Sequence, residues 1–447
     1  MTRPPVLGTD RPAPWLGSLA GWAVVLVATA GAAAALSRTP PPTLAVGAAG
    51  AALGVLALAL ARYDLVVALG FLLLGIARIE PSPSDALFSI AIAVAIAGGR
   101  LDLRRVPGAI LGLLGALLAL NLLSASNAID LGEGMRFMLI TAYLIAFAAW
   151  LTTYLRTETR MRLVIRAYII GAAVCSAVAV LALLVPFPDH AHLVRDGARA
   201  EGLFKDPNVF GPFLVPAALI LLYEVLQPRL LRMRRATTVV LLVVVSLGTV
   251  LSYSRAAWLN LAVALVVMVG ALALRPGSGR MATAALALLL ASIAVAGTVI
   301  VASGSTSFLR ERARPQAYDA ERFQAQRIGV GLAERHVLGI GPGQVEVEGP
   351  VSTHSIYVRV LAEQGVIGLA VLVGVLGGTL LIAVGNLVAG RSSLGVDAAV
   401  LLATWCGLLA NSAFVDTLHW RHLWIVAALI WVGAAARRHG QLRSPST

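Results

Sequence analysis

The sequence predicts an all-α fold: a polytopic transmembrane helical bundle of about 12–14 helices with one large extracytoplasmic loop. Of the 447 residues, 59% are hydrophobic and only 13% are charged, whereas a soluble domain carries about 25% charged residues. The apolar residues also fall in long runs, and a helix needs about 20 of them to cross a bilayer core. These runs do not alternate with polar residues as the strands of a membrane barrel do. Helices are therefore the predicted spanning element.

The predicted spans begin after a short N-terminal tail and continue almost to the C-terminus. By residue number they are 19–36, 43–61, 65–79, 86–99, 106–123, 134–154, 163–185, 208–226, 236–252, 256–274, 281–302, 360–388, 397–415 and 420–436. The runs at 65–79 and 86–99 are short enough to be interfacial or re-entrant. The predicted organisation is a cytoplasmic tail at 1–18 without a removable signal peptide, transmembrane helices at 19–302, a large extracytoplasmic loop at 303–356, C-terminal transmembrane helices at 357–436 and a cytoplasmic tail at 437–447.

The net charge of +13 has the arrangement of a membrane anchor. Arginines cluster in short connections such as 156–166 and 229–235, and such clusters mark the cytoplasmic side of membrane proteins. This distribution excludes nucleic acid as the partner and predicts contact with anionic lipid head groups instead. The two cysteines, Cys175 and Cys406, each lie inside a predicted span and are interpreted as small apolar side chains.

Two polar connections on the extracytoplasmic side are longer than the others, at 186–207 and about 303–356. Loops longer than about 12–15 residues are usually functional or disordered. The second one ends in the glycine-punctuated sequence GIGPGQ at 339–344 and has little low-complexity character. We therefore expect it to be structured. No internal repeat indicates a transporter with inverted halves.

Two residues at the membrane boundary could carry chemistry. Arg255 in SYSRAAW lies between two apolar runs, where an arginine is a functional candidate; the alternative is a side chain that snorkels to the surface. His354 lies where the large loop enters a helix, and a histidine can exchange a proton near neutral pH, although a lone histidine is often structural. Within the helix, Arg359 and Glu363 have ion-pair spacing.

Other polar residues are weaker candidates. Arg322 in ERFQAQR could bind phosphate through its guanidinium fork, or it could belong to a solvated loop face. Lys205, the one lysine in the chain, precedes Asp206 and Pro207, which together predict a helix start. The remaining candidates, which could line the same cavity or form an interfacial belt with the neighbouring tryptophans, are Asp416, His419 and Arg421.

Several common catalytic patterns are absent from the sequence. There is no Walker-type loop, no metal-spaced His/Cys/Asp cluster and no GxSxG elbow. No pair of extracytoplasmic carboxylates stands out for glycoside hydrolysis. The sequence therefore predicts no metal site and no cofactor.

Taken together, five segments of the chain resemble the O-antigen ligase and polymerase superfamily of bacterial membrane glycosyltransferases. They are GLFKDPNVFGPFL at 202–214, SYSRAAW at 252–258, ERFQAQRIGVGLAERHVLGIGPGQ at 321–344, HSIYVRVLAEQGVIGL at 354–369 and VDTLHWRHLWIVAAL at 415–429. The resemblance covers roughly residues 200–430 and rests on the order and spacing of these motifs. It implies a GT-C-like helical bundle in the inner or plasma membrane with an extracytoplasmic active site.

The resemblance also implies a reaction and a set of residue roles. Family members transfer a glycan from a lipid diphosphate, typically undecaprenyl diphosphate, to an acceptor hydroxyl; the acceptor can be a glycan, a lipid or a protein. By motif, Arg255 and Arg322 would bind the diphosphate and His354 would be the general base, with Lys205, Asp416 and Arg421 as possible accessory residues. The family often has Asn after this histidine, whereas this chain has Ser355.

The implied chemistry is an inverting, metal-independent transfer. Diphosphate is a good leaving group, two fixed guanidinium groups would stabilise its growing charge, and a positioned base typically contributes about 10²–10⁴-fold. Two other classes of function remain open at this point. In a non-catalytic carrier or flippase for lipid-linked saccharides, the arginines would bind diphosphate while His354 does no chemistry. In a structural partner within an envelope assembly, neither arginine would affect donor binding.

Overall fold

The fold is an all-α bundle with one small β-hairpin. The computed structural model describes residues 42–185, 190–275, 279–302, 317–349 and 352–441. The predicted span at 19–36, the predicted tail at 1–18 and residues 303–316 of the predicted large loop lie outside this described part.

The α-helices are α2 (Pro42–Ala61), α3 (Tyr63–Leu72), α4 (Pro83–Ala97), α5 (Gly108–Ser124), α6 (Leu131–Tyr154), α7 (Glu158–Leu184), α8 (Pro207–Leu226), α9 (Arg235–Leu251), α10 (Arg255–Ala273), α11 (Gly279–Ala302), α13 (Ala317–Arg335), α14 (Val345–Glu348), α15 (Ile356–Val388), α16 (Ala398–Ser412) and α17 (Arg421–Gln441). Short 3-10 helices are η2 (Leu73–Gly75), η3 (Leu103–Arg105), η4 (Ala125–Asn127) and η5 (His190–Leu193), and the hairpin pairs β1 (Val194–Arg195) with β2 (Arg199–Ala200).

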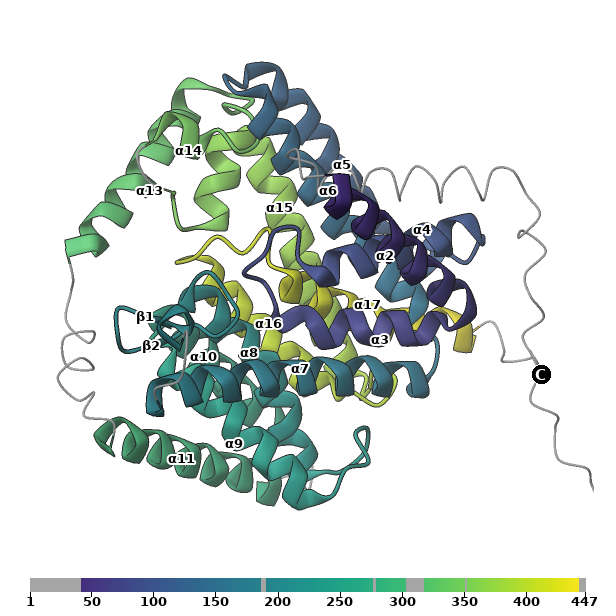
Figure 1. The fold of residues 1–447 in the computed structure, drawn as a ribbon, viewed down its shortest axis with the longest axis vertical. Helices are drawn as coiled ribbons and strands as arrows, with labels where there is room; N and C mark the ends of the chain where they lie inside the picture. Colours follow the sequence, from purple (N-terminus) through teal and green to yellow (C-terminus); the bar gives the residue numbers. More distant parts are fainter. Residues whose placement is uncertain (1–41, 186–189, 276–278, 303–316, 350–351, 442–447) are drawn as a thin grey trace, which may run out of the picture.

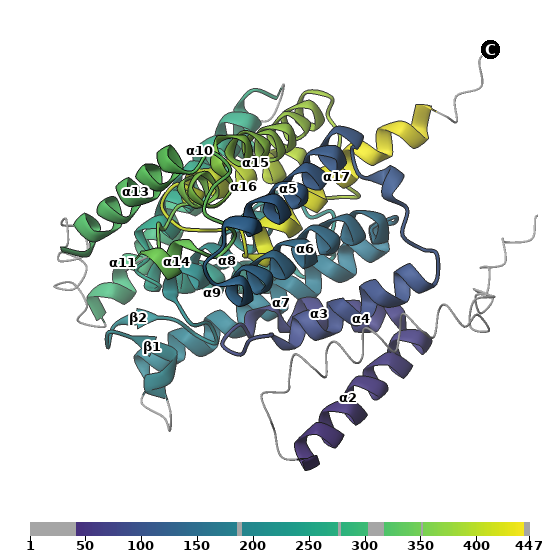
Figure 2. The ribbon, with the colours of Figure 1, turned by 90° about the horizontal axis from the view of Figure 1, so that it is seen from above.

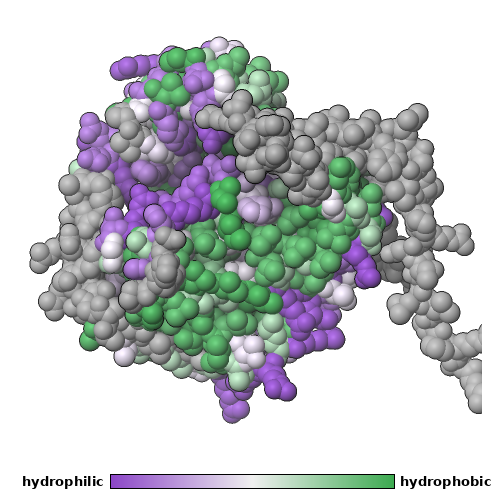
Figure 3. All heavy atoms as spheres, viewed as in Figure 1, coloured by the Kyte–Doolittle hydropathy of each residue, from purple (hydrophilic) through white to green (hydrophobic). Residues whose placement is uncertain are grey.

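Every predicted span from 43–61 onward coincides with a helix of this bundle, and the chain is a multi-pass membrane protein. By length and composition, six of the described helices can cross a membrane, and shorter apolar helices such as α3 and α4 lie beside them. Large apolar side chains such as Val266 and Leu381 are exposed on the surface. Figure 3 shows a broad hydrophobic band over α3 and α7 with hydrophilic patches at either end. Burial of such a surface requires lipid, since soluble monomers expose much smaller apolar patches.

The irregular segments gather at one end of the bundle. In Figure 1, β1, β2 and α13 lie on the same side, at the end of the bundle where α7 finishes. We call this side the loop end; it comprises residues 190–206, 252–255, 317–349, 352–356 and 413–420. Figure 2 shows α2 lying to one side of the bundle, next to α3 and α4. The arginine-rich short connections, 155–157 and 227–234, lie at the opposite end of α7 and α8.

Part of the predicted large loop is a helix. Residues 317–335 form α13, although this segment contains no long apolar run and lies inside the predicted loop. Its sequence is nevertheless rich in Ala, Glu, Gln and Arg, which favour helix formation. The described part of this segment is thus largely helical, with α13 and α14 on either side of the GIGPGQ turn.

Helix α15 is broken at Gly365, where φ is 69° and ψ is −172°. The carbonyl groups of Ala362 and Glu363 at the break accept hydrogen bonds from the backbone N–H groups of Ile340 and Gly341, at 3.0 and 3.1 Å. The GIGPGQ loop therefore fills the break and satisfies the carbonyl groups that the helix has released. This contact fixes the first turns of α15, which follow His354, against the loop that follows α13.

Replacing Gly365 with alanine is expected to destabilise the protein. A Cβ atom there would lie 1.9 Å from the carbonyl oxygen of Val337, and this backbone conformation, which is essentially restricted to glycine, costs another residue about 1–3 kcal/mol in addition. The measurement is the melting temperature of the purified variant in detergent. Gly377→Ala is the matched control, because Gly377 lies in the same helix with nothing within 4 Å of its Cβ position. Equal melting temperatures for the two variants would contradict the account of the break.

Candidate active site

His354 lies at the loop end, directly before α15. Its φ is 49°, a left-handed conformation that is uncommon for a residue other than glycine and is often found at functional sites. Helix α13 rests on this segment, because a Cβ on Gly329 would lie 2.8 Å from the Val358 side chain and 3.0 Å from that of Thr353. A glycine in the middle of α13 thus permits the close approach of the helix to the residues around His354.

Arg255 is the first residue of α10, which Ser254 caps by accepting a hydrogen bond from the N–H of Ala257 at 3.3 Å. The guanidinium group forms a paired contact with the carboxylate of Asp319 in α13, with Nη1 3.0 Å from Oδ2. Asp319 and Arg322 are three residues apart and therefore neighbours on the surface of α13. The structure thus brings Arg255 to the helical turn that carries Arg322.

The motifs GLFKDPNVFGPFL and SYSRAAW contact each other next to Arg255. Arg199 of the β-hairpin donates to the carbonyl oxygen of Ser252 and to the side chain of Asn208, both at 3.2 Å. In α8, a Cβ on Gly211 would lie 2.5 Å from Ser252 Oγ and 2.7 Å from Ala257 Cβ. The start of α8 and the turn before α10 therefore meet closely, and the glycine of FKDPNVFG makes the contact possible.

The electrostatic surroundings of His354 favour a neutral imidazole. Burial lowers its pKa below the ordinary value of 6.5, and the positive charge of Arg322 lowers the pKa further. Asp206 and Asp416 act in the opposite direction, and Arg359 in the same direction as Arg322. A neutral imidazole can accept a proton at neutral pH. The three candidate residues are therefore near one another. The charge of Arg322 acts on His354, and Arg255 contacts Asp319, which lies on the same turn of α13 as Arg322.

Lys205 contacts the segment that precedes α4. Its Nζ atom is 2.9 Å from Oε1 of Glu80, which is also paired with Arg136 at 3.3 Å. Asp206 caps α8 by accepting a hydrogen bond from the N–H of Asn208 at 2.8 Å, as the sequence predicted. The negative charge of Asp206 raises the pKa of His354.

Arg421 joins two distant parts of the bundle. Its Nε atom is 2.6 Å from Oδ1 of Asp85 in α4, and Tyr143 in α6 donates to the same carboxylate oxygen at 3.0 Å. This contact holds the start of α17 against α4 and α6. The structure thus gives Arg421 a partner remote in sequence, which no spacing rule could indicate.

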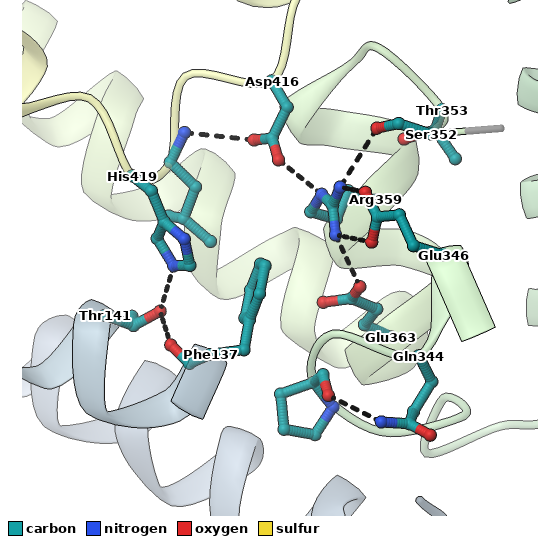
Figure 4. Close-up of polar contacts among 12 residues, drawn as sticks. Phe137, Thr141, Gln344, Glu346, Ser352, Thr353, Arg359, Glu363, Asp416 and His419 are labelled. Atoms are coloured by element: carbon teal, nitrogen blue, oxygen red, sulfur yellow. Dashed lines mark hydrogen bonds and ion pairs between the residues drawn. The ribbon is translucent and has the colours of Figure 1, made fainter. Parts of the chain in front are cut away.

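Asp416 and His419 lie together in the connection between α16 and α17 (Figure 4). Asp416 is ion-paired with Arg359. The imidazole of His419 is 2.9 Å from Thr141 Oγ1 and lies over the ring of Phe137, with ring centroids 4.0 Å apart. Burial lowers the pKa of His419 to about 4, so that this second imidazole is also neutral.

Sequence reasoning missed the extent of the contacts around Arg359. The predicted ion pair with Glu363 is present, with an N–O distance of 2.9 Å. Arg359 also binds Glu346, Ser352 and Asp416. These partners come from three other segments, so that local spacing carried no signal for them. Within the described part of the chain, no group of three or more His, Cys, Asp or Glu side chains could hold a metal ion.

The comparison with protein-family models supplies the deciding observation. Residues 238–373 match the family model described as O-antigen ligase. This segment is similar to the O-antigen ligase family. It runs from the start of α9 into α15 and includes Arg255, Arg322 and His354, and it confirms the resemblance that the motifs predicted. A search of curated proteins found no match to the chain.

Proposed function

We propose that this protein transfers a glycan from a lipid diphosphate, of the undecaprenyl type, to an acceptor hydroxyl, with inversion and without a metal ion. The observation that carries the proposal is the juxtaposition of a neutral imidazole, His354, with Arg322 and with the helical turn that binds Arg255. The match of residues 238–373 to the O-antigen ligase family model supports the same reaction class.

The proposed reaction takes place outside the cytoplasm. Short connections rich in arginine lie at the end of the bundle opposite to His354, and such connections normally face the cytoplasm. The loop end would then face the outer leaflet of the inner or plasma membrane, where the long lipid chain of the donor could remain in the bilayer while its diphosphate reaches the arginines.

In the proposed step, the Nδ1 or Nε2 atom of His354 takes the proton from the acceptor hydroxyl. The hydroxyl oxygen forms a bond to the anomeric carbon of the donor glycan from the face opposite to the diphosphate. The bond between that carbon and the diphosphate oxygen breaks, and the electron pair leaves with the lipid diphosphate. Arg322 and Arg255 would stabilise the negative charge that grows on the leaving group, while binding of both substrates supplies proximity.

The direct test of the proposed function is transfer by the purified protein. The protein in lipid nanodiscs would be given undecaprenyl-diphosphate-linked oligosaccharide with a fluorescent label, and the product would be analysed by mass. Formation of a glycosidic bond with release of undecaprenyl diphosphate is the expected result. Binding of the donor without any transfer, for every acceptor class offered, would instead favour a carrier or flippase. Because a ligase and a polymerase share the donor and differ in the acceptor, the acceptor that is used decides between them.

The rate of transfer is expected to depend on pH through His354. The base is active only when neutral, and its pKa in the folded protein is lowered below 6.5. The rate should therefore rise with pH along an acidic limb whose midpoint lies below pH 6.5, and should be level above it through neutral pH. The measurement is kcat/KM for the donor from pH 4.5 to 8, because this quantity reports the pKa of the base in the free protein. An acidic limb centred above pH 7 would contradict the assignment.

A further inference from the structure

Arg359 forms a buried junction five residues after His354. Its side chain lies in the first half of α15 and is 3% exposed. The guanidinium group donates to Glu346 of α14 and to Glu363 of α15, both at 2.9 Å, and to Ser352 Oγ at 3.1 Å. It is also ion-paired with Asp416 of the α16–α17 connection. Figure 4 shows these acceptors arranged around the one guanidinium group.

The flat face of the same guanidinium group lies over an aromatic ring. Its central carbon is 5.0 Å from the ring centroid of Phe137 in α6, a favourable arrangement of a cation and an aromatic face. The same ring also contacts the imidazole of His419, which is bound to Thr141 of α6. Residues 413–420 are thus attached to α6 and to α15 at one place.

The contacts of Arg359 bear directly on the position of His354. Ser352, which accepts a hydrogen bond from the guanidinium group, lies two residues before His354, and α15 begins two residues after His354. The chain is therefore held on both sides of a residue in a left-handed conformation, which persists only where the surrounding structure enforces it. Asp416, held by the same guanidinium, is one of the charges that act on His354.

We propose that Arg359 is a positioning residue for glycan transfer: its guanidinium group holds residues 352–354 and the connection at 413–420 in the arrangement that presents His354 to Arg322. This inference rests on the proposed function. Arginine is required because a single planar group with five N–H donors meets four acceptors from different directions. A lysine keeps the charge but cannot make these contacts together.

The charges around His354 provide a readout that a purely structural role would not change. The groups that act on the imidazole are Arg322 of α13, Asp206 at the start of α8, Arg359 of α15 and Asp416 of the α16–α17 connection. Removal of the charge at 359 takes away one cation and leaves the carboxylate of Asp416 without its partner. Both changes raise the pKa of His354. The acidic limb of the pH–rate profile should then move to higher pH.

The test compares Arg359→Lys and Arg359→Met in the full-length protein in nanodiscs. We expect a loss of turnover of about 10²-fold in both variants, as a small misplacement of a catalytic group produces, with donor KM nearly unchanged. Only Arg359→Met should shift the acidic limb of the pH–rate profile towards higher pH. The midpoint of the NMR titration of ¹⁵N-labelled His354 should shift in the same direction in that variant. Arg335→Met, an exposed arginine at the end of α13, is the matched control and should behave as the wild type.

Asp416→Asn keeps the test decisive if Arg359→Met does not fold, because it removes the charge of one acceptor of the junction and should lower the pKa of His354. Where Arg359→Met does fold, the double variant Arg359→Met with Asp416→Asn should shift the limb back relative to the single variant. Wild-type turnover and pH dependence in folded Arg359→Lys and Asp416→Asn would overturn the inference. Absence of transfer by the wild type, or transfer that is independent of His354, would instead refute the proposed function itself.

Discussion

Replacement of His354 with asparagine is expected to lower the rate of glycan transfer by about 10²–10⁴-fold, the usual contribution of a positioned general base. Asparagine is the suitable substitute because it tolerates a left-handed backbone, and φ at this position is 49°. Donor binding should remain, since the diphosphate is assigned to Arg255 and Arg322. The measurements are the single-turnover transfer rate and the equilibrium binding of labelled lipid-linked oligosaccharide.

The control for this variant is His336→Asn, which makes the same substitution in an exposed residue after α13. The control should transfer at the wild-type rate. Intact transfer by His354→Asn would refute the catalytic role of the imidazole. Loss of both donor binding and transfer in His354→Asn would show that the imidazole acts in donor binding.

Replacement of Arg322 with methionine is expected to weaken donor binding by about 10–150-fold. A hydrogen bond between charged groups contributes about 1.5–3 kcal/mol, which corresponds to this range, and a guanidinium fork is suited to a diphosphate. Methionine keeps an unbranched, flexible side chain, although a shorter one, and removes the charge and the N–H donors. Binding of undecaprenyl diphosphate itself, measured at several salt concentrations, gives the effect without any chemistry.

Arg327→Met is the matched control for that experiment, because Arg327 is exposed and lies five residues further along the same helix. Equal donor affinities in Arg322→Met and Arg327→Met would exclude a diphosphate site at Arg322. Such a result would favour a structural role for the arginines of α13. Arg255→Met should also weaken donor binding, together with a loss of the contact that anchors the start of α13 at Asp319.

The bundle was predictable from sequence because its elements depend on local pattern. A run of apolar residues specifies a membrane helix by itself, and the predicted span at 208–226 differs from α8 by one residue at its start. The cap at Asp206 and Pro207 was equally readable, since cap and helix are adjacent in the chain. Helix α13 escaped prediction because it lacks an apolar run and is held by contacts such as Gly329 with Thr353.

The candidate site was predictable only in part. The residue types of Arg255, Arg322 and His354 and the motifs around them indicated phosphate binding and proton transfer, and the structure places them near one another. The junction at Arg359 was not predictable beyond Glu363. Its other partners lie up to 57 residues away (416 minus 359), and only the folded chain determines which carboxylates meet one guanidinium. The same holds for Arg421, whose partner Asp85 belongs to α4.

A structure of the protein in nanodiscs with undecaprenyl diphosphate bound would test the central claim most directly. The account predicts that the diphosphate lies between the guanidinium groups of Arg255 and Arg322, with the imidazole of His354 facing the side from which an acceptor hydroxyl would approach. A diphosphate bound at the arginine-rich end of the bundle would contradict it. A diphosphate separated from that imidazole by more than the length of one sugar ring would contradict it as well.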